Sequence, residues 1–268
     1  MKHINTIDLF SGTGSFTKES QAMGHTVHTF DTCPQSRIFF NYPEGSPVAK
    51  ASHSFKNILE PQPFPDMFGD SILWASPPCE SFSVASIGRH WHADKFTAEG
   101  IRAPKSPQAE LGLSLLRRTV EIIATTRPKY WFIENPRGMM KKQIHAIFKA
   151  YGITDYAEHC VSYCQYGDEN MKPTNIWTNC PHFVPRPMCK PFKYDKVTGE
   201  IINRHCHHNS ARRGSTTGIQ GVSTYRDKSR VPAELIREVL TACHLGFYHD
   251  KQKEDRLEAY AEKLLNRE

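Results

Sequence analysis

The sequence predicts an α/β fold in which parallel strands form a Rossmann-like sheet and ligands bind at the carboxyl ends of the strands. Three observations favour it. Residues 4–10 form an apolar run that passes through a turn with two glycines into a helical segment. Two later apolar runs, residues 72–75 and 130–133, each end in a polar segment that contains proline. Between these two runs, residues 108–126 repeat apolar side chains at helical spacing.

The first predicted element is a strand over residues 4–10, followed by the turn Ser11-Gly12-Thr13-Gly14 and a helix to about Met23. Glycines let a backbone approach a ligand closely, and the start of a helix points amide donors at it. The second strand, residues 26–30, ends in Asp31. This is about where a nucleoside-binding α/β domain has the acidic residue that holds the ribose hydroxyls.

The next strand, residues 72–75, leads into Ser76-Pro77-Pro78-Cys79. Prolines have a fixed φ and cannot donate to a sheet ladder, so they stiffen the strand end that carries the thiol. The strand over residues 130–133 leads into Glu134-Asn135-Pro136, and thiol and carboxyl group make a pair of nucleophile and acid. Taken singly, the motifs leave two other interpretations open: Cys79 is a small buried apolar residue, or Glu134 caps the following helix.

Three further segments complete the predicted outline. Residues 81–107 are long and polar, which is typical of a lid or of a disordered loop. The helix over residues 108–126 is expected to cover the sheet. Residues 250–268 repeat apolar side chains at helical spacing among charges, so we expect a terminal helix that packs on the domain or on a partner.

In their order and spacing, these motifs resemble those of the DNA cytosine-5 methyltransferases. In that family an Asp-Leu-Phe-x-Gly-x-Gly loop and a strand-end acid bind S-adenosylmethionine, and a Pro-Cys dipeptide supplies the nucleophile. The glutamate of a Glu-Asn-Val motif contacts the target base, and a Val-Pro step leads into a helix beside the first loop. The matching positions in this sequence are residues 8–14, Asp31, Pro78, Cys79, Glu134, Asn135, Val231 and Pro232.

The resemblance implies a Rossmann-like, S-adenosylmethionine-dependent methyltransferase fold with a small irregular target recognition domain. The implied reaction is transfer of a methyl group to carbon 5 of cytosine in double-stranded DNA. Cys79 would attack carbon 6, Glu134 would hold ring nitrogen 3 and the amino group, and the base would be flipped out of the duplex. The cofactor-binding residues that it implies are Phe10, Ser11, Gly12, Gly14, Asp31, Asn57, Ile58, Pro78 and Val231.

Three segments depart from the family pattern. Asn57-Ile58 stands where Asp-Ile is expected, and an amide oxygen can still accept the hydrogen bond of the adenine amino group. The Gln-x-Arg-x-Arg segment that contacts the base and phosphates appears as residues 170–174, where Lys172 keeps one charge but is not a forked donor. Pro136 replaces the usual valine. These departures indicate a divergent, bacteriophage-type member, with Lys172 as a third residue of the catalytic centre.

Positive charge is concentrated between Met171 and Arg230, where eleven Lys or Arg accompany three Asp or Glu, although the whole chain carries only +6. Such a window is the electrostatic footprint of phosphate binding, unless it is only a solvated surface. It contains the predicted target recognition domain, residues 178–228, between a catalytic domain at 1–177 and a returning helix at 229–249. The predicted DNA contacts are Arg89, Lys172, Arg212, Arg213 and Ser215.

The same window also carries enough ligands for a tetrahedral structural zinc: Cys180, His182, Cys189, Cys206 and His207. A domain this small gains from a metal, because its core alone rarely stabilises it. Since no Cys-x-x-Cys knuckle is present, reduced cysteines and surface histidines are the alternative interpretation.

Two other functions stay open. Residues 76–79 differ by one residue from the Ser-Pro-Pro-Tyr type of motif in amino-group DNA methyltransferases, where no covalent bond forms, but Glu134 then has no role. A non-catalytic DNA-binding module would not require the cofactor loop. Because no apolar run has the length of a membrane span and no signal peptide precedes the first strand, we expect the chain in the cytoplasm of a bacterium or an infected host cell. We also expect a monomer.

Overall fold

The computed structural model describes residues 4–32, 52–54, 57–65, 67, 69–168, 170–189, 193–203 and 229–265. Its elements, in chain order, are β1 (Asn5–Leu9), α1 (Ser15–Ala22), β2 (Thr26–Phe30), β3 (Ser52–Ser54), β4 (Ser71–Ala75), η3 (Val84–Ser86), α2 (Ile87–His90), β5 (Trp91–Phe96), β6 (Arg102–Pro104), α3 (Pro107–Thr126), β7 (Tyr130–Pro136), α4 (Met140–Ala150), β8 (Ala157–Ser162), η4 (Tyr163–Tyr166), β9 (Pro173–Thr178), β10 (Lys193–Tyr194), β11 (Ile201–Asn203) and α6 (Ala233–Leu265).

Seven of the strands form one sheet in the order β3-β2-β1-β4-β7-β9-β8. Neighbouring strands are parallel from β3 to β7, whereas β9 is antiparallel to both β7 and β8. All five residues of β4 are buried, as expected for a central parallel strand with helices on both faces. The predicted Rossmann-like α/β fold is confirmed.

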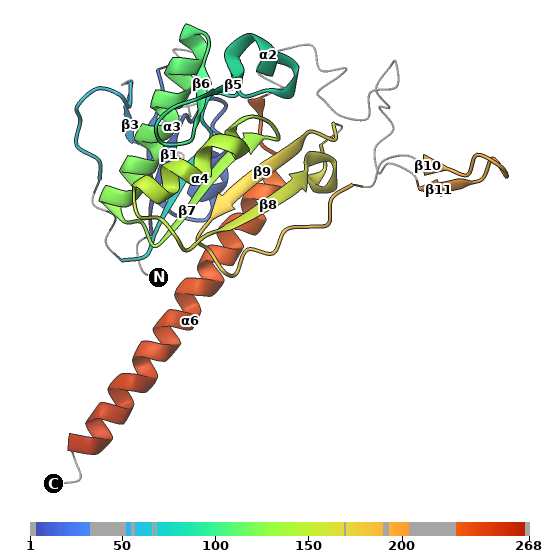
Figure 1. The fold of residues 1–268 in the computed structure, drawn as a ribbon. Helices are drawn as coiled ribbons and strands as arrows, with labels where there is room; N and C mark the ends of the chain where they lie inside the picture. Colours follow the sequence, from blue (N-terminus) through green and yellow to red (C-terminus); the bar gives the residue numbers. More distant parts are fainter. Residues whose placement is uncertain are drawn as a thin grey trace, which may run out of the picture.

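The strand order reverses next to β1, because the chain runs from β1 outward to β2 and β3 and then returns to β4 on the other side. Open α/β sheets bind ligands outside the carboxyl ends of the strands at such a switch point. Figure 1 shows β1, β7, β9 and β8 of this sheet. In the chain, the glycine turn follows β1 and Cys79 follows β4. Both predicted motifs therefore follow the carboxyl ends of adjacent parallel strands.

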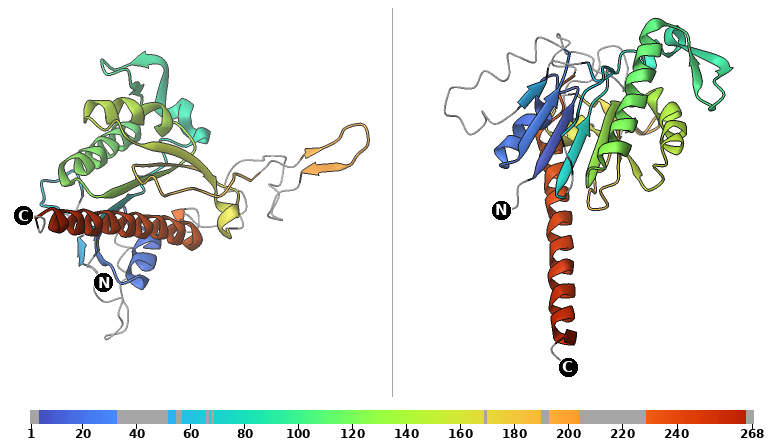
Figure 2. Two further views of the ribbon diagram at one scale, coloured as in Figure 1. Left: turned by 90° about the horizontal axis from the view of Figure 1, so that it is seen from below. Right: turned by 90° about the vertical axis from the view of Figure 1, so that its left-hand side faces the viewer.

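Two apolar clusters fill the two sides of the sheet. One joins α3 and α4 to sheet residues such as Leu73 and Ile133, and the other joins α1 and α6 to Trp74 and Phe132 on the opposite face. Figure 2 shows the resulting three layers, with the sheet between the two pairs of helices. Helix α3 begins where Ser106 accepts the Ala109 amide at 3.2 Å, which is an ordinary N-terminal cap.

Helix α6 continues without a break across residues 249 and 250, where the sequence suggested a boundary between a returning helix and a tail. Its first half is part of the second cluster through Leu235, Val239 and Cys243. Residues 251–259 are all exposed, and this half of the helix projects beyond the sheet (Figure 2). No helix in the described part of the chain has the length and apolarity that spanning a bilayer requires.

Residues 81–107, expected to be a lid or disordered, contain η3, α2 and the antiparallel hairpin β5–β6. Two apolar side chains, Trp91 and Ile101, are 2% and 1% exposed and fix the hairpin to the first cluster. The indole nitrogen of Trp91 also donates to the carbonyl of Ser81 at 2.7 Å. The segment is ordered because of these few buried side chains, which its polar composition concealed.

Candidate active site

The glycine turn has a backbone that few residues other than glycine adopt. Phe10, Gly12 and Gly14 have positive φ values of 63°, 43° and 66°, and α1 begins directly after Gly14. The two glycines adopt these angles without a Cβ penalty, whereas Phe10 is strained. The turn therefore brings its amides and the start of α1 to the carboxyl end of β1.

Asp31, at the end of β2, lies against this turn. Its Oδ2 accepts the Gly12 amide at 2.7 Å. The hydroxyl of Ser11 is buried and has no hydrogen-bond partner among the described residues. A buried polar atom without a partner is rare, and Ser11 directly precedes Gly12, whose amide binds the predicted ribose acid. These residues fit a nucleoside cofactor.

Asp8 in β1 links the strand before the turn to the helix after it. Its Oδ2 accepts the amide and the hydroxyl of Thr17 at 3.2 and 2.6 Å, which fixes α1 to the strand. Burial raises the pKa of this carboxyl to about 7, the charge of Asp31 adds to the rise, and the two Thr17 hydrogen bonds oppose it. Asp8 is thus a structural residue that ionises near neutral pH.

Two other predicted cofactor contacts lie beside β3. Ile58 is 3% exposed, and its carbonyl accepts Nε of Arg118 at 3.0 Å. The side-chain oxygen of Asn57 accepts the Leu59 amide at 3.1 Å, which makes a local turn. An adenine amino group would share this oxygen with the Leu59 amide.

Cys79 follows β4 and opens a tight turn in which its carbonyl accepts the amides of Phe82 and Ser83 at 3.0 and 2.9 Å. The side chain is half-buried. Burial raises the pKa of the thiol to about 11, the charge of Lys172 lowers it, and those of Glu80 and Glu134 raise it. Because only the thiolate of a cysteine is a strong nucleophile, this raised pKa leaves the Cys79 thiol protonated and weakly reactive at neutral pH.

Glu134 lies inside β7, opposite Ile176 of β9, and not beyond the end of the strand as predicted. The strand is longer than its apolar run because β9 pairs with it as far as Pro136. Glu134 is 4% exposed, and its Oε1 accepts the hydroxyl of Tyr163 at 2.7 Å. It does not cap a helix, since α4 begins only at Met140.

Hydrogen bonds link β7, which contains Glu134, to the segment that follows β4 and contains Cys79. Nδ2 of Asn135 donates to the carbonyl of Pro77 at 2.8 Å, directly before the Pro-Cys dipeptide. Beyond this point, the Met139 amide donates to the carbonyl of Phe82 at 2.8 Å. Two hydrogen bonds therefore hold the turn after Cys79 against β7 and the loop that follows it.

Lys172 precedes β9 and is 6% exposed. Its φ of 23° is unusual for a residue with a Cβ, and its Nζ lies 4.6 Å from the centroid of the Tyr163 ring. Since its charge acts on the Cys79 thiol, the structure brings three predicted residues together: Cys79, Glu134 and Lys172. Tyr163 was missed, because nothing in the spacing of a tyrosine 29 residues after Glu134 marks it as a partner.

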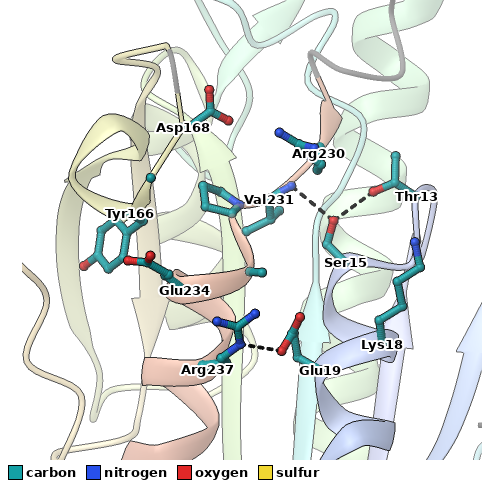
Figure 3. Close-up of a pocket in the computed structure, with 13 residues that line it drawn as sticks. Thr13, Ser15, Lys18, Glu19, Tyr166, Asp168, Arg230, Val231, Glu234 and Arg237 are labelled. Carbon is teal, nitrogen blue, oxygen red and sulfur yellow. Dashed lines mark hydrogen bonds and ion pairs between the residues drawn. The ribbon is translucent and has the colours of Figure 1, made fainter. Parts of the chain in front are cut away.

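Beside the glycine turn, a pocket of about 660 Å³ separates α1 from the start of α6 (Figure 3). The amide of Val231 donates to Oγ of Ser15 at 3.3 Å, so the Val-Pro step does lie beside the first loop. Across the pocket, Arg237 of α6 pairs with Glu19 of α1 at 2.7 Å. This contact joins the two helices at the base of the pocket.

Other predicted residues lie apart from this centre or cannot be placed. Arg89 is exposed on α2, in the segment that follows Cys79. Arg212, Arg213 and Ser215 lie outside the described residues, as do the zinc candidates Cys206 and His207.

The remaining zinc candidates are not gathered around a metal site. The thiol of Cys180 is hydrogen-bonded to Cys243 of α6, and Cys189 is buried with its amide on Oγ of Ser162. In the part of the chain that the structure describes, no three histidine, cysteine or acidic side chains could hold a metal ion together. The zinc prediction therefore gains no support from Cys180, His182 or Cys189.

The sequence of this chain is similar to those of known proteins. The profile of the C-5 cytosine-specific DNA methylases matches residues 4–153. A protein of Frog virus 3 (isolate Goorha) named "Probable DNA (cytosine-5)-methyltransferase" is 31% identical over 246 residues, which are 90% of this chain and 100% of that protein.

Among solved structures, the Entamoeba histolytica methyltransferase EhMeth is 13% identical, with a TM-score of 0.49 over 91% of this chain and 98% of that one. A variant of Spodoptera frugiperda DNMT2 is 14% identical, with a TM-score of 0.43, and this chain spans 55% of its length.

Proposed function

This chain belongs to the C-5 cytosine-specific DNA methylase family, and we propose that it methylates carbon 5 of cytosine through a covalent adduct on Cys79. Membership makes it a DNA (cytosine-5)-methyltransferase that uses S-adenosylmethionine. One observation carries the residue assignment. Cys79 follows β4 and Glu134 lies in the adjacent strand β7, and the charge of Glu134 acts on the Cys79 thiol.

We assign the cofactor to the glycine turn and its neighbours. S-adenosylmethionine supplies the methyl group when it is bound. Asp31 would hold the ribose hydroxyls, and the unpartnered Ser11 hydroxyl and the amides of the turn would serve the rest of the molecule. Ile58 would cover the adenine ring from the side of β3, with Asn57 next to it. Val231, which lines the pocket beside this turn, and Pro78, which follows β4, would complete the cofactor site.

The protein residues would divide the chemistry of the base among them. Glu134 would bind ring nitrogen 3 and the amino group of the flipped cytosine, so that negative charge can develop in the ring. The Cys79 thiol would give up its proton to solvent, with Lys172 stabilising the thiolate, and the sulfur would bond to carbon 6. The electrons of the carbon 5–carbon 6 double bond would move into the ring that Glu134 holds, which makes carbon 5 the nucleophile. After carbon 5 has received its methyl group, its proton leaves to solvent. The electrons of that bond restore the ring double bond and expel the sulfur.

DNA binding is assigned to the basic window. We propose that the chain acts as a monomer on double-stranded DNA, with residues 1–177 and α6 as the catalytic body and residues 178–228 reading the target. Arg89 lies close in sequence to Cys79 and would contact the strand near the flipped base. Arg212, Arg213 and Ser215 would contact phosphates or base edges.

A structural zinc in the target-reading segment would have to rely on Cys206 and His207, together with ligands that the described residues do not bring together. It stays a prediction. Elemental analysis of the purified chain tests it, because a structural site requires about one equivalent of zinc.

DNA that carries 5-fluorocytosine tests the proposed function. Fluorine cannot leave carbon 5 as a proton does, so the enzyme should remain bonded to the DNA, and Cys79→Ala should abolish the adduct. Nucleoside analysis of ordinary DNA should give 5-methylcytosine. Methylation of an exocyclic amino group without a trapped complex would instead favour the Ser-Pro-Pro-x type of enzyme. DNA binding without any methylation would favour a non-catalytic module.

A further inference from the structure

We propose that Tyr163 is the positioning residue of the catalytic centre: its hydroxyl fixes one oxygen of Glu134, and its ring seats the ammonium group of Lys172. One neutral side chain would thus set the places of two of the three charged groups that act on Cys79, Lys172 and Glu134 but not Glu80. The proposal rests on the function proposed above and adds a residue that no sequence motif of this chain indicated.

The hydrogen bond to Glu134 decides how that carboxylate can meet a base. Tyr163 is the first residue of η4 and is 0% exposed. Its hydroxyl donates to Oε1 of Glu134 at 2.7 Å. A carboxylate with one oxygen fixed in this way presents its other oxygen, Oε2, in a defined direction. Glu134 therefore does not have to find its orientation when the cytosine arrives, which is the advantage of a preorganised site.

The phenol is suited to this role because it stays a donor at any physiological pH. Burial raises the pKa of Tyr163 well above its usual value, and the charge of Glu134 and its hydrogen bond raise it further. Asp168, the other acid that acts on it, works in the same direction. A lysine in this place would bring a second charge, whereas the tyrosine holds the carboxylate without neutralising it.

The ring of Tyr163 serves the second charged group. Nζ of Lys172 lies 4.6 Å from the ring centroid, a cation–π distance, and the lysine is nearly fully buried. The backbone of Lys172 is held at a positive φ just before Pro173 starts β9. Ring and backbone together direct the ammonium group toward Cys79, whose thiol feels its charge.

Tyr163→Phe separates the two roles, because it keeps the ring for Lys172 and removes only the hydroxyl. We expect kcat for methyl transfer to fall about ten-fold or more, the usual consequence of losing a hydrogen bond to a charged group. KM for DNA and for S-adenosylmethionine should stay within about two-fold. A merely structural tyrosine would raise both KM values and lower the unfolding temperature along with kcat.

Tyr156→Phe is the matched control. Its hydroxyl also makes a 2.7 Å hydrogen bond, to Nδ1 of His145, but its ring packs in the cluster on the other face of the sheet. The same chemical change there should leave kcat within about two-fold.

A double-mutant cycle with Glu134→Gln then asks whether Tyr163 acts through Glu134. The rate of adduct formation on 5-fluorocytosine DNA is the measurement. If Tyr163 acts through Glu134, adding Tyr163→Phe to Glu134→Gln should lower the rate of adduct formation little further, because the two residues work as a unit. A wild-type rate for Tyr163→Phe, or losses that multiply in the double variant, overturns the proposal. If the unmodified chain forms no adduct and no 5-methylcytosine, it is the proposed function that fails, and this inference with it.

Discussion

The carbonyl oxygen of Phe82 lies so close to Gly138 that a Cβ on Gly138 would overlap it. Phe82 belongs to the turn that follows Cys79, and Gly138 follows the strand of Glu134, so this contact joins the two segments that carry the proposed catalytic residues. The contact is between backbone atoms, which cannot turn aside as a side chain can.

Gly138→Ala should therefore push the turn and the strand apart. We expect a loss of about 1–3 kcal/mol in the free energy of unfolding, as for other overpacked sites, measured by urea denaturation. The methylation rate should fall with it. Gly88→Ala is the control, because a Cβ there meets nothing within 4 Å and the unfolding free energy should change by less than about 0.5 kcal/mol. Equal effects at the two glycines would contradict the role of the contact.

Asp31→Ala should weaken S-adenosylmethionine binding about ten-fold or more, because a charged acceptor for hydroxyls is typically worth about 1.5–3 kcal/mol. Calorimetric titration measures it. Since Asp31 also holds the Gly12 amide, Asp31→Asn is the informative companion. It can keep that hydrogen bond and should bind the cofactor better than the alanine variant. Unchanged affinity in both variants means that the ribose is held elsewhere.

Asp8 should make the stability of the protein depend on pH. Burial raises the pKa of this carboxyl from 3.8 to about 7, so between these values the folded chain keeps a proton that the unfolded chain has lost. Stability is then lost as the pH rises through this window, by up to roughly 1.4 kcal/mol per pH unit. Asp8→Asn keeps the shape and removes the proton. Its stability relative to the wild type, from urea denaturation, should increase between pH 5 and pH 7.5, and a constant difference would contradict the assignment.

Lys172 should control the reactivity of Cys79. In the free enzyme, alkylation of Cys79 should rise about ten-fold per pH unit up to about pH 11, because only the thiolate reacts. Lys172→Met removes the charge that lowers this pKa and should slow the reaction, whereas Lys172→Arg should largely preserve it. Peptide mass spectrometry gives the rates, with Cys160 as the internal control because Arg137 and Lys141 act on it instead. If Cys79 is alkylated at the same rate in Lys172→Met as in the wild type, Lys172 does not control the reactivity of this thiol.

Arg212 and Arg213 lie outside the described residues, and their role is open to a salt titration. DNA affinity should fall steeply with salt, with a log–log slope of about −0.9 for each neutralised phosphate. Replacing both arginines by alanine should make the slope shallower by up to roughly 1.8, while cofactor affinity stays the same. Lys251→Ala with Lys253→Ala removes two exposed positive charges from α6 and should leave the slope unchanged. If the slope is the same after both arginines are replaced, they do not contact phosphates and their charge serves solubility.

The sequence predicted local elements well where one pattern decides them. The strand at residues 26–30 has the predicted bounds, and α3 begins one residue before its predicted start, since Ser106 caps it. Elements that depend on distant pairing were harder to see. Strand β7 is longer than its apolar run because of β9, and Trp91 fixes a hairpin in a segment that is polar in composition. The same difference holds for the site. Local motifs predicted Cys79 and Glu134 as site residues, whereas the hydrogen bond from Tyr163 to Glu134 depends on the folded structure and leaves no pattern in the sequence.

The single helix α6 divides into two parts with different thermodynamics. Up to Phe247 one face of the helix is buried in the core, so those turns melt only with the whole protein. From Lys251 to Ala259 every side chain is exposed, and helices of this length are marginal in water without packing. Amide hydrogens in the projecting half should therefore exchange with solvent many times faster than those near Val239. Hydrogen exchange along this one helix would therefore measure global unfolding near its start and local fraying near its end.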